Sequence, residues 1–254
     1  AGCGGRQKDR DVILATTTSL QDSGLLDVLL PMFEEQTDYE LTPVSVGTGA
    51  ALEMGARGDA DVVFVHAPEA EREWMDAGNG TERVLVMYND FLIVGPPDDP
   101  AGIRGSDSAT DALRVIAERD AAWVSRDDNS GTDQLARQLW EGAGIDPGGE
   151  SWFIRSGQGM GATLTLADQR QAYTLSDRGT WLASRDDLDL EIMVAGDPAL
   201  LNLYHVMPVN PEQHPDLDIN LDGAEAFVEF LTSEETQRVI AEYGVDTYGE
   251  PLFY

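Results

Sequence analysis

Short apolar segments alternate with amphipathic segments along most of this chain, and this alternation restricts the fold more than any other feature. Residues 12–15, 41–46 and 61–65 are apolar and rich in β-branched side chains, as buried strands are. Residues 25–35 and 50–56 carry apolar side chains at helical spacing. Strands that alternate with helices predict βαβ units, so we expect an α/β fold built on mainly parallel sheets.

Two apolar strands, at 89–97 and 204–209, divide the pattern into two groups of elements. Each ends at or next to proline, and we interpret both strands as crossings of the chain between two lobes. The elements expected between the crossings include 113–119, 122–125, 133–141 and 172–175. The sequence therefore predicts two lobes, each a mainly parallel sheet flanked by helices.

The expected domain boundaries follow from these crossings. Lobe 1 comprises 12–90 and 206–254, lobe 2 comprises 91–205, and residues 1–11 form a polar tether. The tether begins Ala1-Gly2-Cys3 and contains the only cysteine, which resembles the end of a lipoprotein signal. We expect Cys3 to carry a lipid that anchors the protein outside the cell membrane; a chance terminal cysteine is the alternative.

Charge restricts the partners. The chain has 47 Asp and Glu against 16 Lys and Arg, a formal net charge of −31, which argues against nucleic acid and anionic lipid. Because 42% of the residues are hydrophobic and the acids are spread along the chain, an acidic disordered tail does not explain the charge. At molar salt the Debye length falls to about 3 Å, which removes most of the self-repulsion. We therefore predict a salt-adapted protein from a halophile.

Hydroxyls and glycines are concentrated in the turns that lead from predicted strands into predicted helices. These turns are 16–19, 47–49, 130–132, 157–159 and 177–180. Helix N-termini expose backbone N–H groups and the positive end of the helix dipole, so such turns can together surround an anion. The alternative for any one turn is simple N-capping, which needs only one side-chain oxygen. Four consecutive hydroxyls at 16–19 exceed that need.

Arg126 and Arg178 stand beside two of these turns and could add charge-assisted contacts to an anion, although surface ion pairs with the abundant aspartates are the alternative.

The sequence gives little support to a catalytic function. The three histidines, His66, His205 and His214, are scattered without metal-ligand spacing.

Several sequence blocks, taken in order, resemble a known family. They are 15–19, 22–26, 46–49, 58–62, 87–91, 125–132, 157–164 and 173–180. From about residue 12 to residue 231 the chain resembles the tungstate-binding proteins of the TupA type. That resemblance implies a type II periplasmic-binding-protein fold, a tetrahedral oxyanion held between two lobes, and delivery of the ion by a monomer to an ABC permease. It implies tungstate or molybdate as the ligand, no cofactor and no metal cation.

Carried over block by block, the resemblance also implies the oxyanion-binding residues. They are Thr17, Thr18, Ser19, Thr48, Arg126, Ser130, Thr132 and Arg178.

The sequence also allows three other functions. The first is phosphate binding, for which Asp22, Asp128 or Asp177 could accept the proton of a protonated phosphate. The second is an extracytoplasmic hydrolase with Asp61, Asp90 or Asp177 as general base, although capping is the simpler role for these carboxylates. The third is a ligand sensor on the same fold.

Overall fold

The computed structural model describes residues 10–128 and 130–254. Cys3 and nearly all of the expected tether lie outside the described residues. The chain forms two compact units, one of Ala1–Tyr88 with Leu203–Tyr254 and the other of Asn89–Asn202. We call them unit 1 and unit 2. The lobe boundaries expected from the sequence, after residues 90 and 205, stay a prediction.

Unit 1 is built on a sheet in the order β2-β1-β3-β9. Its strands are β1 (Asp11–Thr17), β2 (Glu40–Val46), β3 (Val62–Val65) and β9 (Leu201–Pro208). β1 runs parallel to both β2 and β3, whereas β9 runs antiparallel to β3. The helices of this unit are α2 (Thr18–Asp22), α3 (Leu25–Gln36), α4 (Thr48–Arg57), α5 (Pro68–Asp76), α10 (Leu221–Thr232), α11 (Glu234–Glu242) and α12 (Val245–Tyr248), with a 3-10 turn η3 (Pro211–Gln213).

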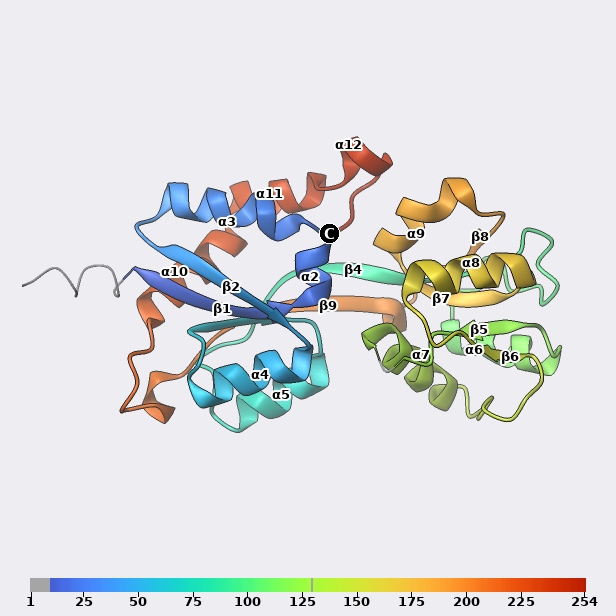
Figure 1. The fold of residues 1–254 in the computed structure, drawn as a ribbon, viewed down its shortest axis with the longest axis horizontal. Helices are drawn as coiled ribbons and strands as arrows, with labels where there is room; N and C mark the ends of the chain where they lie inside the picture. Colours follow the sequence, from blue (N-terminus) through green and yellow to red (C-terminus); the bar gives the residue numbers. More distant parts are fainter. Residues whose placement is uncertain (1–9, 129) are drawn as a thin grey trace, which may run out of the picture. The chain divides into compact units, whose positions relative to one another are not determined.

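Helices cover both faces of the unit 1 sheet. In Figure 1, α3 and α11 lie above the sheet and α4 and α5 lie below it. On the α4 and α5 face, Val63 packs with Leu52 and Trp74. On the other face, the Phe227 ring lies 6.5 Å from that of Phe64, centre to centre. β3 is therefore buried on both faces, which explains its uninterrupted apolar sequence.

Unit 2 has a parallel core that is extended by antiparallel strands. Its strands are β4 (Val84–Gly95), which begins in unit 1, β5 (Trp123–Ser125), β6 (Phe153–Arg155), β7 (Tyr173–Asp177) and β8 (Glu191–Val194). β5 is parallel to β6 and β7, and β4 is antiparallel to β7 and β8. The helices are α6 (Ala109–Glu118), α7 (Gly131–Gly142), α8 (Met160–Arg170) and α9 (Arg178–Ser184), with short 3-10 turns η1 (Arg185–Asp187) and η2 (Pro198–Leu200).

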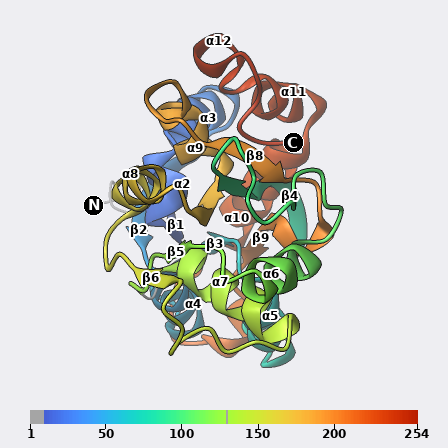
Figure 2. The same cartoon turned by 90° about the vertical axis from the view of Figure 1, so that its right-hand side faces the viewer.

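The unit 2 sheet is also covered on both faces. Figures 1 and 2 place α6 and α7 on one face and α8 and α9 on the other. Trp123 and Tyr173 are almost completely buried in the core of this unit. The α/β class with mainly parallel sheets flanked by helices is thus confirmed, and β4, β8 and β9 supply the antiparallel pairings.

Within residues 10–128 and 130–254, no helix has the length and apolar character that crossing a membrane requires.

Asp61, considered above as a general base, holds parts of unit 1 together. Its side chain is buried and accepts hydrogen bonds from the backbone N–H groups of Ile13 (2.7 Å) and Asn220 (2.8 Å). Its own backbone N–H donates to the Ile13 carbonyl at 2.9 Å. Burial raises the pKa of Asp61, although the two N–H donors act in the opposite direction. Asp61 therefore links the start of β1 to the turn before α10.

We predict that Asp61→Ala lowers the free energy of unfolding by about 2–4 kcal/mol, because two backbone N–H groups lose their acceptor inside the protein. Urea unfolding at constant high salt measures the change. Asp59→Ala is the matched control: Asp59 is exposed and forms an ion pair with the exposed Arg57, so its loss should change stability little. Equal losses in the two variants would contradict this role of Asp61.

Candidate functional site

Three turns meet at one edge of the unit 1 sheet. Because β2, β1 and β3 are parallel neighbours, their carboxyl ends lie along the same edge. Thr48 follows β2, Thr18 and Ser19 follow β1, and His66 follows β3. The carboxyl-terminal edge of a parallel sheet is the usual position of ligand sites in α/β folds.

The four hydroxyls at 16–19 have different environments. Thr16 is fully buried and donates to the Phe64 carbonyl at 2.8 Å. Thr17 is also buried and caps α2, since its Oγ1 accepts from the Leu20 N–H at 3.2 Å. Thr18 and Ser19 are exposed. The capping alternative is therefore correct for Thr17 as a structural role, and its contact with an anion stays a prediction.

The start of α4 has no side-chain cap. Its N-cap residue is Gly47, which is extended at φ −69° and ψ 151°. A Cβ atom at Gly47 or Gly49 would meet nothing within 4 Å, so the space over this turn is open. The first N–H groups of α4 point toward that space, together with the half-exposed Thr48. α4 thus offers backbone donors and the positive end of its dipole to an anion.

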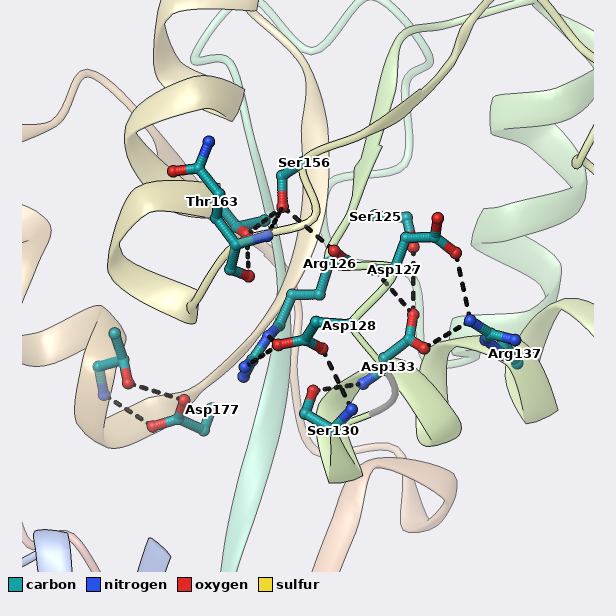
Figure 3. A network of polar contacts seen from close by, with 12 residues as sticks. Ser125, Arg126, Asp127, Asp128, Ser130, Asp133, Arg137, Ser156, Thr163 and Asp177 are labelled. Atoms are coloured by element: carbon teal, nitrogen blue, oxygen red, sulfur yellow. Dashed lines mark hydrogen bonds and ion pairs between the residues drawn. The ribbon is translucent and has the colours of Figure 1, made fainter.

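In unit 2, the turn after β5 is held by its own side chains, as Figure 3 shows. Ser130 caps α7 by accepting from the Asp133 N–H at 3.3 Å. Asp128 accepts from the Ser130 N–H at 3.1 Å and from Arg126 Nε at 3.1 Å, and it forms a further short contact with Arg126 Nη2. Burial disfavours the charged form of Asp128, but the hydrogen bonds from Ser130 and Arg126 lower its pKa overall. Asp128 is therefore ionised and already paired.

Asp133 organises this turn from inside the protein. Its side chain is fully buried, and it accepts from the Asp127 N–H at 3.0 Å and the Ser125 hydroxyl at 3.5 Å. It also pairs with Arg137 at 2.8 Å (Figure 3). Asp127 adopts a left-handed φ of 50°, and the hydrogen bond from its N–H to Asp133 holds the backbone in this uncommon conformation. Sequence reasoning missed Asp133; its position in the first turn of a helix that follows a Ser-Gly-Thr turn was the available signal.

The start of α8 resembles that of α4. Its N-cap is Gly159, without a side-chain cap. Cβ atoms at Gly157, Gly159 and Gly161 would each meet nothing within 4 Å. Ser156 Oγ bonds Thr163 Oγ1 at 2.7 Å and donates to the Arg126 carbonyl at 3.3 Å, which fixes the turn beside Arg126 (Figure 3). None of the predicted site residues belongs to this turn, because its donors are backbone N–H groups rather than side chains. The glycines at 157, 159 and 161 were the sequence signal for an open helix start.

The last turn carries a buried ion pair. Arg178 contacts both oxygens of Asp90, from Nε at 2.5 Å and from Nη2 at 2.7 Å. Asp177 caps α9 by accepting from the Thr180 N–H at 2.7 Å and its hydroxyl at 2.8 Å. Neither Asp90 nor Asp177 is thus placed as a general base. Thr132, also among the predicted ligands, is buried near the start of α7.

These turns supply many hydrogen-bond donors, while the nearby carboxylates are engaged. Asp90, Asp128 and Asp177 each use their oxygens within the protein. In the part of the chain that the structure describes, no three His, Cys, Asp or Glu side chains gather as a metal site would require. Taken by itself, each unit thus offers donors of the kind that suit a ligand which only accepts hydrogen bonds.

Comparison with known proteins identifies the family. Residues 4–235 match the model of a PBP superfamily domain. The chain belongs to the PBP superfamily.

Relatives of this PBP-superfamily protein cover nearly its whole length. A Haloferax volcanii protein, provisionally named an ABC transporter anion-binding protein, is 50% identical over 250 residues, which are 96% of this chain and 72% of the relative. The tungstate-binding protein TupA of Peptoclostridium acidaminophilum is 48% identical over 97% of this chain and 86% of its own. The solved structure of the tungstate-binding protein TupA from Desulfovibrio alaskensis G20 is 43% identical, with a TM-score of 0.89 over 96% of this chain and 98% of that chain.

These similarities confirm the type II periplasmic-binding-protein fold and the resemblance to TupA-type proteins. The relatives are named as binding proteins rather than enzymes, in agreement with the expectation that this PBP-superfamily protein is not an enzyme. The relative from Haloferax volcanii supports the halophilic character that the charge predicts.

The Arg178–Asp90 pair generates a prediction about stability. Arg178→Met leaves the Asp90 carboxylate buried without its cation, which should lower the free energy of unfolding by about 3 kcal/mol. Adding Asp90→Asn should recover part of that loss, because the uncompensated charge is removed. Thermal and urea unfolding of the two variants check both statements. Arg57→Met, which breaks exposed pairs with Glu53 and Asp59, serves as the control and should change stability little. A double variant less stable than Arg178→Met would contradict the argument.

Proposed function

We propose that this protein captures tungstate outside the cytoplasm, with molybdate as the closest competitor, and delivers it to an ABC importer. The name of the TupA relatives, together with 48% and 43% identity over nearly the whole chain, supports the ligand and the transport role. One observation in this structure carries the proposal. The predicted turns present exposed hydroxyls and helix starts without a side-chain cap, whereas Asp90, Asp128 and Asp177 beside them accept hydrogen bonds from the protein itself.

The chemistry of the anions explains why this matters. Tungstate and molybdate are fully deprotonated tetrahedral dianions at neutral pH, so all their oxygens accept hydrogen bonds. Phosphate retains a proton near neutral pH and needs an acceptor from the protein. Of the three acceptors considered for phosphate, Asp128 is paired with Arg126 and Ser130, and Asp177 caps α9. Only the exposed Asp22 remains, at the end of α2. The phosphate alternative is therefore the weaker one.

Each unit provides part of the proposed donor set. Unit 1 contributes the hydroxyls of Thr18, Ser19 and Thr48 and the open start of α4. Unit 2 contributes Arg126, Arg178 and the open start of α8. Thr17, Ser130 and Thr132 complete the proposed set as caps or buried neighbours of these groups. A nanomolar dissociation constant corresponds to about −12 kcal/mol, which several charge-assisted hydrogen bonds in a preorganised site can supply.

The large negative charge of the protein does not oppose this function at high salt. At a Debye length of about 3 Å, the net charge of −31 is screened over the distance from most surface carboxylates to a bound ion. Contacts within hydrogen-bonding distance are screened far less. Affinity is then set by local donors, and the surface charge mainly slows encounter at low salt.

The remaining parts of the proposal concern the place of the protein in the cell. We propose that it acts as a monomer, that it works with a membrane permease, and that a lipid on Cys3 anchors it. The Ala-Gly-Cys sequence supports the anchor. Mass spectrometry of the protein from native membranes tests it, since a diacylglycerol on Cys3 gives a defined mass increase.

Isothermal titration in high-salt buffer with tungstate, molybdate, sulfate and phosphate tests the ligand. Tight one-to-one binding of tungstate, alone or with molybdate, is the expected result. If phosphate gives a binding heat while tungstate and molybdate give none, the protein is a phosphate-binding protein instead.

Single substitutions test the placement of the site. Thr18→Ala and Arg126→Ala should each weaken tungstate binding at least about tenfold, because each removes a donor to the anion. Thr42→Ala on β2 and Arg119→Ala after α6 are matched controls, since both residues are exposed away from the predicted turns. Titration calorimetry measures all four. Unchanged affinity in both test variants would show that the site lies elsewhere.

The open start of α4 gives an independent test. In Gly47→Asp, the extended backbone lets the new carboxylate cap the helix, so the apo protein should be at least as stable as the wild type. The same carboxylate would occupy the N–H groups and repel a dianion, so tungstate affinity should fall at least about tenfold. Gly149→Asp adds the same charge in an exposed loop where a Cβ also meets nothing within 4 Å. If both variants bind tungstate equally well, α4 is not part of the site.

A further inference from the structure

Ser19 and His66 are joined by a hydrogen bond at the edge of the unit 1 sheet. Ser19 Oγ lies 3.0 Å from His66 Nε2 and 3.1 Å from Thr17 Oγ1. Thr17 Oγ1 in turn accepts from the Leu20 N–H at 3.2 Å. The four groups form a continuous chain of polar contacts that runs from the helix backbone to the imidazole.

The donor and acceptor capacities of these groups allow a set of hydrogen-bond directions that fills both lone pairs of Ser19 Oγ. A hydroxyl has one proton to donate and two lone pairs that accept. Thr17 Oγ1 already accepts from the Leu20 backbone, and its own proton can be donated to Ser19 Oγ. If His66 carries a proton on Nε2, that N–H also donates to Ser19 Oγ. Both lone pairs of Ser19 are then used, and its proton must be donated to another partner.

We infer that His66 is a positioning residue which, together with Thr17, makes the exposed Ser19 hydroxyl an obligate donor to the bound oxyanion. The inference rests on the proposed function and extends it to selectivity. A Ser19 whose lone pairs are filled cannot accept the proton of a protonated anion. The arrangement therefore favours fully deprotonated oxyanions over protonated ones, such as hydrogen phosphate.

The surroundings of His66 hold its ring in place. The imidazole packs against the ring of the almost fully buried Tyr204, with 4.6 Å between the ring centres and the planes tilted by 32°. The next residue, Ala67, donates its backbone N–H to Glu71 Oε1 at 2.6 Å. Glu71 is itself fully buried and accepts from Arg83 at 2.7 Å through its other oxygen. The turn that carries His66 is thus fixed from behind by a buried carboxylate.

A double-mutant cycle tests the inference. His66→Met keeps an unbranched side chain of useful length but removes the donor, whereas His66→Gln retains an N–H group near the position of Nε2. Ser19→Ala removes the hydroxyl that His66 is inferred to orient. Each variant, and the His66→Met variant in the Ser19→Ala background, is titrated with tungstate and with phosphate in high salt, and its thermal unfolding is recorded.

We expect His66→Met to weaken tungstate binding about three- to tenfold, the value of one neutral hydrogen bond, and His66→Gln to stay within about twofold of the wild type. In the Ser19→Ala background, His66→Met should have less than about a twofold further effect. The ratio of tungstate affinity to phosphate affinity should fall in His66→Met.

Two results would overturn the inference. If His66→Met binds tungstate as the wild type does, His66 does not position Ser19. If the same loss appears in the Ser19→Ala background, His66 acts on the ion directly or through the fold, and the unfolding curves separate those two cases. A wild-type protein that does not bind tungstate would instead refute the proposed function, so the two failures are distinguishable.

Discussion

Backbone N–H groups at helix starts need acceptors, and the way this chain meets that need determines where an anion can bind. The first N–H groups of every helix have no partner within the helix itself. At α2, α7 and α9, side chains of Thr17, Ser130 and Asp177 supply an oxygen. At α4 and α8 a glycine stands at the cap position, and no side chain takes that role. Gly24 and Gly244 also stand at cap positions without a side-chain cap, at α3 and α12. α4 and α8 differ because each follows a strand of a sheet, β2 in unit 1 and β6 in unit 2, so their first N–H groups lie at a sheet edge.

The carboxylates around these turns complete the arrangement. An acidic protein that binds a dianion must keep its own carboxylates from competing for the donors or repelling the ion. Three aspartates near the turns have defined partners: Asp128 pairs with Arg126, Asp90 pairs with Arg178, and Asp133 accepts from the Asp127 N–H in the turn after β5. An arginine held by a carboxylate on one edge loses little conformational entropy when it binds an anion with its remaining N–H groups. These ion pairs therefore both neutralise the carboxylates and hold the arginine side chains in a fixed position.

The sequence predicted the α/β class and most strands of the parallel sheets because their burial on both faces produces continuous apolar segments. It did not predict α5, whose sequence is largely charged and which buries only Glu71 and Trp74. β6 and β8 were also missed, since segments of three and four residues carry too little pattern to be recognised. Long amphipathic or apolar elements can be read from a sequence, but short edge strands and polar surface helices depend on their neighbours.

The same distinction applies to the candidate site. The sequence showed which turns are rich in hydroxyls. It could not show which hydroxyls cap a helix and which are exposed to a ligand, since Thr17 and Thr18 are the same residue type one position apart. Only the structure shows that Thr17 is buried as a cap and Thr18 is exposed. Backbone donors have no side-chain signature, so the start of α8 was visible only as a repeat of glycines. The anions that the protein can bind depend on which donors and acceptors are already paired within the protein. The serines, threonines and glycines of the sequence do not show this pairing by themselves.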